Sequence, residues 1–194
     1  MALASTPASA LQLLGQDIRT VTCAEFRKTI LGRGAVLLHE PDRLHISTVD
    51  PDLLLHGGGE GELGITPGRQ GARFRASKLL AGADQLELRC LSNGQVASVR
   101  YRLPSIMDAG HVERVKEMVA SKYGPPDRRQ DDDGAVFYTW RQNGVNVHVF
   151  KWFPQSTVHI YYVVQGRGQL YREETKRLMQ DEARRKATQQ KDAF

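Results

Sequence analysis

The chain has 194 residues, of which 40% are hydrophobic and 25% are charged, values typical of a globular protein with a sizeable core. Its 27 Lys and Arg residues exceed its 22 Asp and Glu residues, for a formal net charge of +5. The basic residues are scattered along the chain, which argues against nucleic-acid binding, and no stretch of about 18 apolar residues is present to span a membrane.

The first 13 residues (1–13) are small, rich in Ala and Ser, and predicted to be disordered. The triplets Ala-Leu-Ala at 2–4 and Ala-Ser-Ala at 8–10 both resemble signal-peptidase sites. The favoured interpretation is a periplasmic protein whose signal peptide is absent from this chain. The alternative is a flexible linker of a cytosolic protein.

A first helix is predicted to begin at Thr22. Thr22 and Glu25 have the spacing of a capping box, and Cys23, Phe26 and Ile30 follow at helical intervals. Two nearby glycines then end the helix.

Strands are predicted next at 35–39 and 44–49, joined by a turn. A long Gly- and Pro-rich insertion follows at 50–71, while 74–80 carries no clear pattern. With the hairpin described next, these elements form a first helix-plus-sheet unit at 14–103.

Asn93 and Gly94 separate two strand patterns, 85–91 and 96–103. The pair predicts a two-residue type I′ turn, because both of its positions require positive φ. Alternation in the second strand predicts one buried face and one face in contact with water, the latter carrying Ser98, Arg100 and Arg102.

A second helix is predicted at 108–122, and the Gly-Pro-Pro sequence at 124–126 ends it. Its buried stripe consists of Val112, Val115 and Val119. An acidic turn at 131–134 precedes three further strands, and this second unit covers 104–165. The three strands are expected at 136–141, 145–152 and 157–164.

The segment 166–194 is predicted to be a charged C-terminal helix, helical over about 170–189. It has few apolar residues, so it is either lightly docked or partly free. The order of elements predicts an α+β protein made of two related helix-plus-antiparallel-sheet units and a C-terminal helix, and therefore an internal repeat.

Cys23 and Cys90 are the two cysteines of the chain. Neither belongs to a CxxC motif or a Cys/His cluster, which argues against a zinc site. Cys23 shares a helical face with Phe26, and Cys90 shares a strand face with Leu86 and Leu88, so both sulfurs are expected in a core. Two interpretations remain open: two buried thiols, or a disulfide between the first helix and the sheet, which an exported protein would permit.

Motifs for phosphate, calcium or nucleophilic chemistry are missing from the sequence. The Gly-rich segment 57–61 lacks the Gly-Lys-Ser/Thr of a P-loop, and 131–134 lacks the alternating ligands of a calcium loop. No cofactor, metal or catalytic residue is therefore predicted.

The second Asn-Gly pair, Asn143 and Gly144, determines which side chains share a face of the sheet. In a two-residue loop Gln142 pairs with Val145, and the register of the hairpin follows. One face then forms a core, made of Tyr138, Trp140, Val147, Val149, Ile160 and Tyr162. The opposite face is unusually aromatic, and its candidate partner-binding residues are Arg141, His148, Phe150, Trp152, His159 and Tyr161.

Two interpretations of this aromatic face compete. A helix or the other half of the protein covers it, or it binds a partner, with Trp152 and Tyr161 as anchors and Arg141 at the rim. His148 and His159 could share a metal ion, but no third ligand is evident, so no metal site is predicted.

The sequence Lys-Tyr-Gly-Pro at 122–125, followed by Tyr-Thr-Trp at 138–140 on a strand, resembles a pattern in small exported bacterial proteins of unknown function. The repeated helix-plus-hairpin unit over 14–165 is similar to β-lactamase-inhibitor-protein-like domains and to related outer-membrane-assembly lipoproteins. The chain departs from the lipoproteins because no lipobox cysteine lies near its start.

The resemblance implies a non-enzymatic protein whose sheet or loops bind another protein. The resulting hypothesis is a periplasmic protein-binding module that acts in bacterial envelope assembly or as an inhibitor or immunity protein. The alternative is a small-ligand-binding protein or enzyme that uses the Gly-rich loop or the His148/His159 face.

Overall fold

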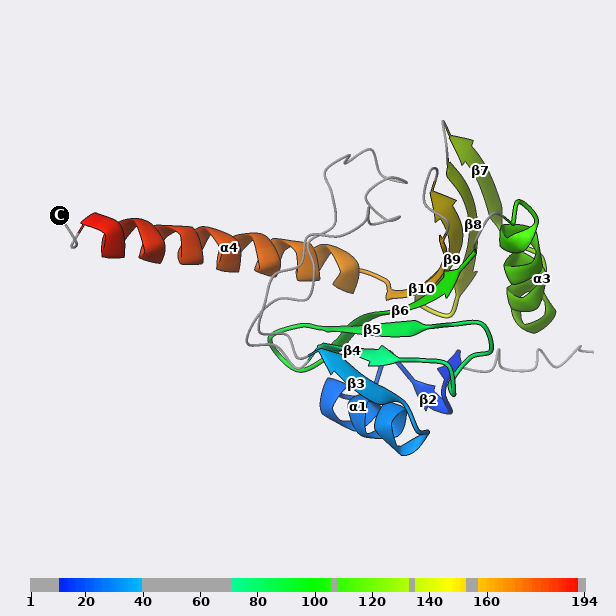
Figure 1. Cartoon of the computed structure of the whole chain (residues 1–194), viewed down its shortest axis with the longest axis horizontal. Helices are drawn as coiled ribbons and strands as arrows, with labels where there is room; N and C mark the ends of the chain where they lie inside the picture. Colours follow the sequence, from blue (N-terminus) through cyan, green and yellow to red (C-terminus); the bar gives the residue numbers. More distant parts are fainter. Residues whose placement is uncertain (1–10, 40–70, 106–107, 133–134, 153–156, 192–194) are drawn as a thin grey trace, which may run out of the picture.

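The computed structural model describes residues 11–39, 71–105, 108–132, 135–152 and 157–191 (Figure 1). Among the described elements, a short hairpin comes first, two runs of one helix and four strands follow, and one long helix comes last. In chain order the elements are β1 (Gln12–Leu13), β2 (Gln16–Asp17), α1 (Cys23–Gly32), β3 (Val36–His39), β4 (Ala72–Arg75), β5 (Gln85–Cys90), β6 (Val96–Pro104), α3 (His111–Tyr123), β7 (Arg128–Asp132), β8 (Ala135–Gln142), β9 (Val145–Trp152), β10 (Thr157–Val164) and α4 (Arg167–Lys191).

One antiparallel sheet spans both halves of the chain. The described strands form an eight-stranded sheet in the order β3-β4-β5-β6-β10-β9-β8-β7. In each half, as far as it is described, one helix precedes four strands that pair in chain order, and the last strands of the two halves, β6 and β10, join them. The predicted α+β class, with two related units and a C-terminal helix, is confirmed.

Helices α1 and α3 cover one face of this strongly twisted sheet (Figure 1). The predicted capping box is present, since the Thr22 hydroxyl accepts from the Glu25 backbone N–H and the Glu25 carboxylate accepts from that of Thr22. At the other helix, Gly124 adopts a φ of 82° at the C-cap of α3. Trp140 of β8 donates from Nε1 to the Gly124 carbonyl at 2.8 Å, so the end of α3 is attached to the sheet.

The core lies between these helices and the sheet. The predicted core residues of the second half are all buried here, together with residues of α1 and of the first half. The largest fully buried side chains include Trp140, Phe26, Phe74, Ile18 and Ile30.

The two Asn-Gly turns differ. Asn143 and Gly144 have φ values of 46° and 82°, as a type I′ turn requires, and Gln142 pairs with Val145 as predicted. At the first turn only Gly94 has positive φ, and the Leu91 N–H donates to the Gln95 carbonyl. The predicted two-residue turn is therefore wrong there: the loop has three residues, and a register shift between Arg89 and Cys90 precedes it.

The β1–β2 hairpin, strand β4 and strand β7 were not predicted. Leu11 and Leu13 are buried beside the β1–β2 hairpin, so the prediction of a disordered segment does not hold for 11–13. Strand β7, with the sequence RRQDD, has the charged composition of a turn but pairs with β8 throughout. The predicted strand 44–49 and the insertion 50–71 lie outside the described residues.

Helix α4 begins on the sheet and then extends beyond it (Figure 1). Tyr171 and Thr175 in its first turns are buried, whereas Leu178 is exposed, as are the described side chains beyond it. Among the described residues no helix combines the length and apolar character needed to cross a membrane.

Candidate functional site

The aromatic face predicted from the sequence is the face of the sheet opposite α1 and α3, called here the polar face. Four of its six predicted residues are buried, with exposed fractions of 4% or less: His148, Phe150, His159 and Tyr161. Arg141 is exposed near the end of β8. Trp152 pairs with Ala135 at the end of β9, and its side chain lies outside the described residues.

Strand register places a line of polar side chains straight across the polar face. Each member lies directly opposite the next on the neighbouring strand. From β4 to β8 the line is Arg73, Glu87, Arg100, Tyr161, His148 and Thr139. It therefore brings residues of both halves together at the β6–β10 junction.

Glu87 is the centre of a buried ion cluster on this face. Its carboxylate accepts from Arg89 at 2.8 Å and from Arg100 at 2.5 Å, and the Arg73 guanidinium lies 3.8 Å away. Arg89 also donates to the Tyr161 hydroxyl at 3.2 Å. The predicted wet face of β6 is wrong at this point, because Arg100 is only 7% exposed.

Sequence reasoning missed this cluster. Glu87 and Arg89 alternate with Leu86 and Leu88, a pattern that is also typical of a strand with a solvated face. The signal that could have found it is the opposition of Glu87 to Arg100 across the hairpin, which needs the correct register.

The two histidines of the polar face have different surroundings. His148 Nδ1 lies 3.1 Å from the Thr139 hydroxyl. His159 stacks on Phe150 with ring centroids 4.8 Å apart, and Phe150 stacks on Phe137. Burial lowers the pKa of His159 well below 6.5, and the positive charges of Arg100 and Arg102 lower it further.

This arrangement disfavours a cation at the histidines. The guanidinium groups that lower the pKa of His159 would also repel a divalent metal ion. Within the described ranges, no group of three or more His, Cys, Asp or Glu residues could hold a metal ion.

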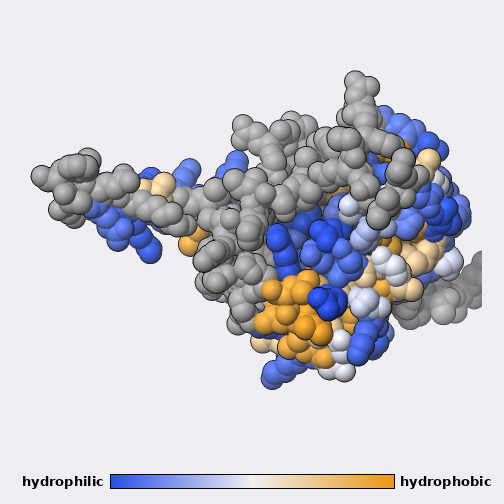
Figure 2. Space-filling view, in the orientation of Figure 1, coloured by the Kyte–Doolittle hydropathy of each residue, from blue (hydrophilic) through white to orange (hydrophobic). Residues whose placement is uncertain are grey.

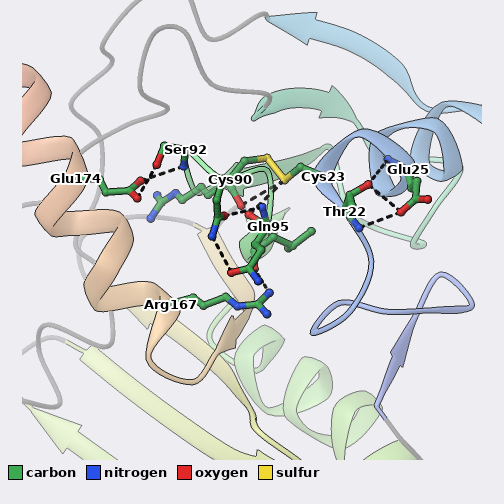
Figure 3. The surroundings of a disulfide bond; sticks show 11 residues. Thr22, Cys23, Glu25, Cys90, Ser92, Gln95, Arg167 and Glu174 are labelled. Atoms are coloured by element: carbon green, nitrogen blue, oxygen red, sulfur yellow. Dashed lines mark hydrogen bonds between the residues drawn. A yellow bond between two sulfur atoms is a disulfide. The ribbon is translucent and has the colours of Figure 1, made fainter.

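Cys23 and Cys90 form a disulfide, the second of the two interpretations left open by the sequence (Figure 3). Their Cα atoms are 6.1 Å apart, and the bond joins the first residue of α1 to the last residue of β5. Close by, Glu174 of α4 accepts from the Ser92 backbone N–H and hydroxyl at 3.1 and 2.8 Å. The disulfide belongs to the core that α1 covers, whereas Tyr171 of α4 packs with Leu91 and Ala97 in a separate cluster.

The two edges of the sheet differ in chemistry. At β7, Arg129 pairs with Asp131 at 3.0 Å, and such charges protect an edge strand from further pairing. At β3, Val36 is 55% and Leu38 is 40% exposed, and Leu31 of α1 is 41% exposed. Figure 2 shows an apolar patch in this region, called here the β3 edge and defined by these three residues.

The β3 edge was also missed by the sequence. The strand itself was predicted, but a hairpin partner at 44–49 was expected beside it, which would have hidden its outer side. In the part of the chain that the structure describes, β3 pairs with β4 alone.

A hollow of about 600 Å³ lies between the N-terminal hairpin, the end of α3 and the end of β8. It is lined by Leu11, Gln12, Leu14, Gly15, Lys122, Tyr123 and Gln142. The ammonium group of Lys122, one of the lining residues, donates to the Gln12 carbonyl at 3.1 Å. The cation of this hollow is therefore already hydrogen-bonded to the protein backbone.

Comparison with known proteins gives little to place the chain. No protein-family model matches it, and no curated protein matches it. A solved structure of a DUF4309 family protein, YjgB from Bacillus subtilis, is similar over 66% of this chain and 88% of its own, with 13% identity and a TM-score of 0.35.

Proposed function

We propose that this protein is a non-enzymatic protein-binding module that captures an extended segment of a partner at the β3 edge. The observation that carries the proposal is the exposure of Val36 and Leu38 on a terminal strand of the sheet. An edge strand directs unpaired N–H and C=O groups outward, and partners add to such edges as a further strand.

The contrast between the two edges supports this location. Strand β3 (VLLH) has none of the charged residues found in β7, although it has a bulge between Leu37 and His39. Its exposed side chains are Val36 and Leu38, and Leu31 of α1 is exposed as well. The apolar side chains would add contact area to the hydrogen bonds of a new strand pair.

Export to the periplasm is part of the proposal. A disulfide between Cys23 and Cys90 is typical of an oxidising compartment. The resemblance to β-lactamase-inhibitor-protein-like domains, drawn from the sequence, is consistent with a role of this module in envelope assembly or as an inhibitor or immunity protein.

The test is a capture experiment from the native envelope with the full chain. Leu38→Lys places a charge on the edge, and Leu170→Lys introduces the same charge at a similarly exposed leucine of α4. We expect the wild type and Leu170→Lys to capture the partner and Leu38→Lys to lose it. Binding of the partner should also slow amide hydrogen exchange at residues 36–39 of this protein. Equal capture by both variants would overturn the proposal.

A second candidate function is that of a small-ligand-binding protein or an enzyme that uses the polar face. It is favoured by the convergence of Glu87, Arg100, Tyr161 and His148 in one line across both halves. The Gly-rich loop that was also considered lies outside the described residues. A screen of small carboxylates and phosphates by thermal shift, repeated with Arg100→Met, separates this candidate from the first.

A further inference from the structure

We infer that the hollow between the N-terminal hairpin, the end of α3 and the end of β8 binds a small organic carboxylate with an apolar body. Its volume of about 600 Å³ lies in the range of pockets that hold small molecules. The site goes beyond the proposed function, because its lining includes no residue of the β3 edge and none of the line across the polar face.

The walls of the hollow are joined to one another by hydrogen bonds. Lys122, near the end of α3, donates from Nζ to the Gln12 carbonyl of β1 at 3.1 Å. Gln142, the last residue of β8, donates from Nε2 to the Tyr123 carbonyl at 3.5 Å. These bonds link three elements that are distant in sequence, so the hollow exists before a ligand arrives, as is usual for small-molecule sites.

Leu14 holds an unfavourable backbone conformation at the wall of the hollow. It forms the turn between β1 and β2 with Gly15, and its φ of 54° lies in the left-handed region. Asn is preferred at such a turn position, and the left-handed conformation is costly for leucine. The Leu14 side chain packs against the core and also lines the hollow. Residues in sparsely populated conformations cluster at ligand sites, so this strain points to a use of the apolar side chain.

The lining combines apolar walls with a few polar groups. Leu11, Leu14 and Tyr123 supply the apolar surface, and two glutamine amides and the Lys122 ammonium supply the polar groups. This composition is typical of sites that cover the apolar body of a ligand and orient it by one polar end.

The polar end of such a ligand would meet positive charge. The Lys122 ammonium lies 5.1 Å from the centroid of the Tyr123 ring, and its three N–H donors allow it to bind a ligand while it donates to Gln12. The Arg33 guanidinium lies against the hairpin, since its Nη2 is 3.3 Å from where a Cβ on Gly15 would be. Neither cation forms an ion pair among the described residues. An anionic group is therefore favoured at this end of the ligand.

Negative groups of the same elements are already engaged. Asp17 of the hairpin forms a two-point pair with Arg19 at 2.9 and 2.5 Å. Asp127, just after α3, accepts from a backbone N–H of β8 at 2.6 Å. The Gly124 carbonyl accepts from Trp140 at the C-terminal end of α3, where unbonded carbonyls would repel an anion. These bonds reduce the repulsion that a carboxylate would meet in the hollow.

The experiment measures binding of small carboxylates to the full chain by isothermal titration calorimetry. The probes are 2-naphthylacetate, 4-phenylbutyrate and octanoate, and the neutral 2-naphthylacetamide is the matched control compound. We expect 2-naphthylacetate to bind about tenfold more tightly than its amide, because the carboxylate accepts a charge-assisted hydrogen bond from the ammonium. The difference should shrink as salt is raised.

Two variants assign the binding to the hollow. Lys122→Met should weaken the binding of 2-naphthylacetate about tenfold, to the level of the amide, and leave the amide unchanged. Leu14→Asn should weaken both compounds, while the fold is kept because Asn-Gly is the preferred pair for this turn. Lys176→Met, at an exposed lysine of α4, is the matched control and should change neither affinity.

Circular dichroism and thermal unfolding establish that each variant is folded. If Leu14→Asn does not fold, Lys122→Met alone decides the outcome, because its side chain is exposed and makes one hydrogen bond. The inference is overturned if none of the three carboxylates binds, or if 2-naphthylacetate and its amide bind equally. Binding that is unaffected by Lys122→Met also overturns it, because the carboxylate would then lie elsewhere.

Discussion

The apolar face of the sheet and the polar face are buried to a similar extent, yet they hold opposite kinds of side chain. Under α1 and α3 the sheet presents Val, Leu, Ile and aromatic residues. On the other side it presents Glu87, two arginines and two histidines that are each 7% exposed or less. Burial on the first face stabilises by itself, whereas burial on the second is tolerated only where charges and hydrogen bonds are paired.

The difference teaches that the two faces should respond differently to substitution. Substitutions on the apolar face should lower the free energy of unfolding in proportion to the packing contacts that they remove, or by the loss of the disulfide. The polar face loses stability when one member of a pair is removed, because the charge of the other member stays buried. The predictions below test this contrast.

The largest effect is expected from the covalent tie on the apolar face. The double variant Cys23→Ser/Cys90→Ser releases a link across a sequence separation of 67 residues. Loss of a native disulfide of this span should lower the free energy of unfolding by about 4 kcal/mol. Urea unfolding of the variant measures the loss, and reductant should produce a similar loss in the wild type only. An unchanged urea midpoint would show that the bond contributes nothing to stability.

A smaller loss is expected from the ion cluster of the polar face. Glu87→Gln removes the carboxylate that Arg89 and Arg100 share, and should cost about 3 kcal/mol of unfolding free energy. The matched control is Asp84→Asn, whose partner Arg102 is 43% exposed and which should cost less than about 1 kcal/mol. Similar losses in the two variants would remove the distinction between a buried and a solvated pair.

The smallest effect is a pH dependence that originates at His159. Its pKa in the folded protein lies well below 6.5, so the unfolded chain binds a proton that the folded protein does not. Stability is therefore retained above the unfolded pKa and lost as pH falls below it, with a slope of at most about 1.4 kcal/mol per pH unit.

His159→Phe should flatten this dependence between about pH 6.5 and 5. His111→Gln is the matched control, because the pKa of His111 is lowered mainly by partial burial and this side chain is only half-buried on α3. Thermal unfolding measured across this range gives the comparison. Parallel curves for wild type and His159→Phe would assign the acid sensitivity to other groups.

The sequence by itself determined the elements whose signal is local. The capping box at Thr22, the valine stripe of α3 and the Asn143 turn act within a few residues, so their patterns survive without knowledge of the rest of the chain. The register from that turn also placed Trp140 on the core face and His148 on the opposite face.

The tertiary structure alone decided which side chains are buried and which are exposed on each face and edge of the sheet. Arg100 was expected in water, and it is buried because Glu87 lies opposite it across a hairpin whose turn the sequence misassigned. Val36 is exposed on a terminal strand of the described sheet, and the hairpin partner predicted at 44–49 lies outside the described residues. Strand order and burial depend on contacts between distant segments, and local patterns of polarity cannot distinguish a paired buried charge from a solvated one.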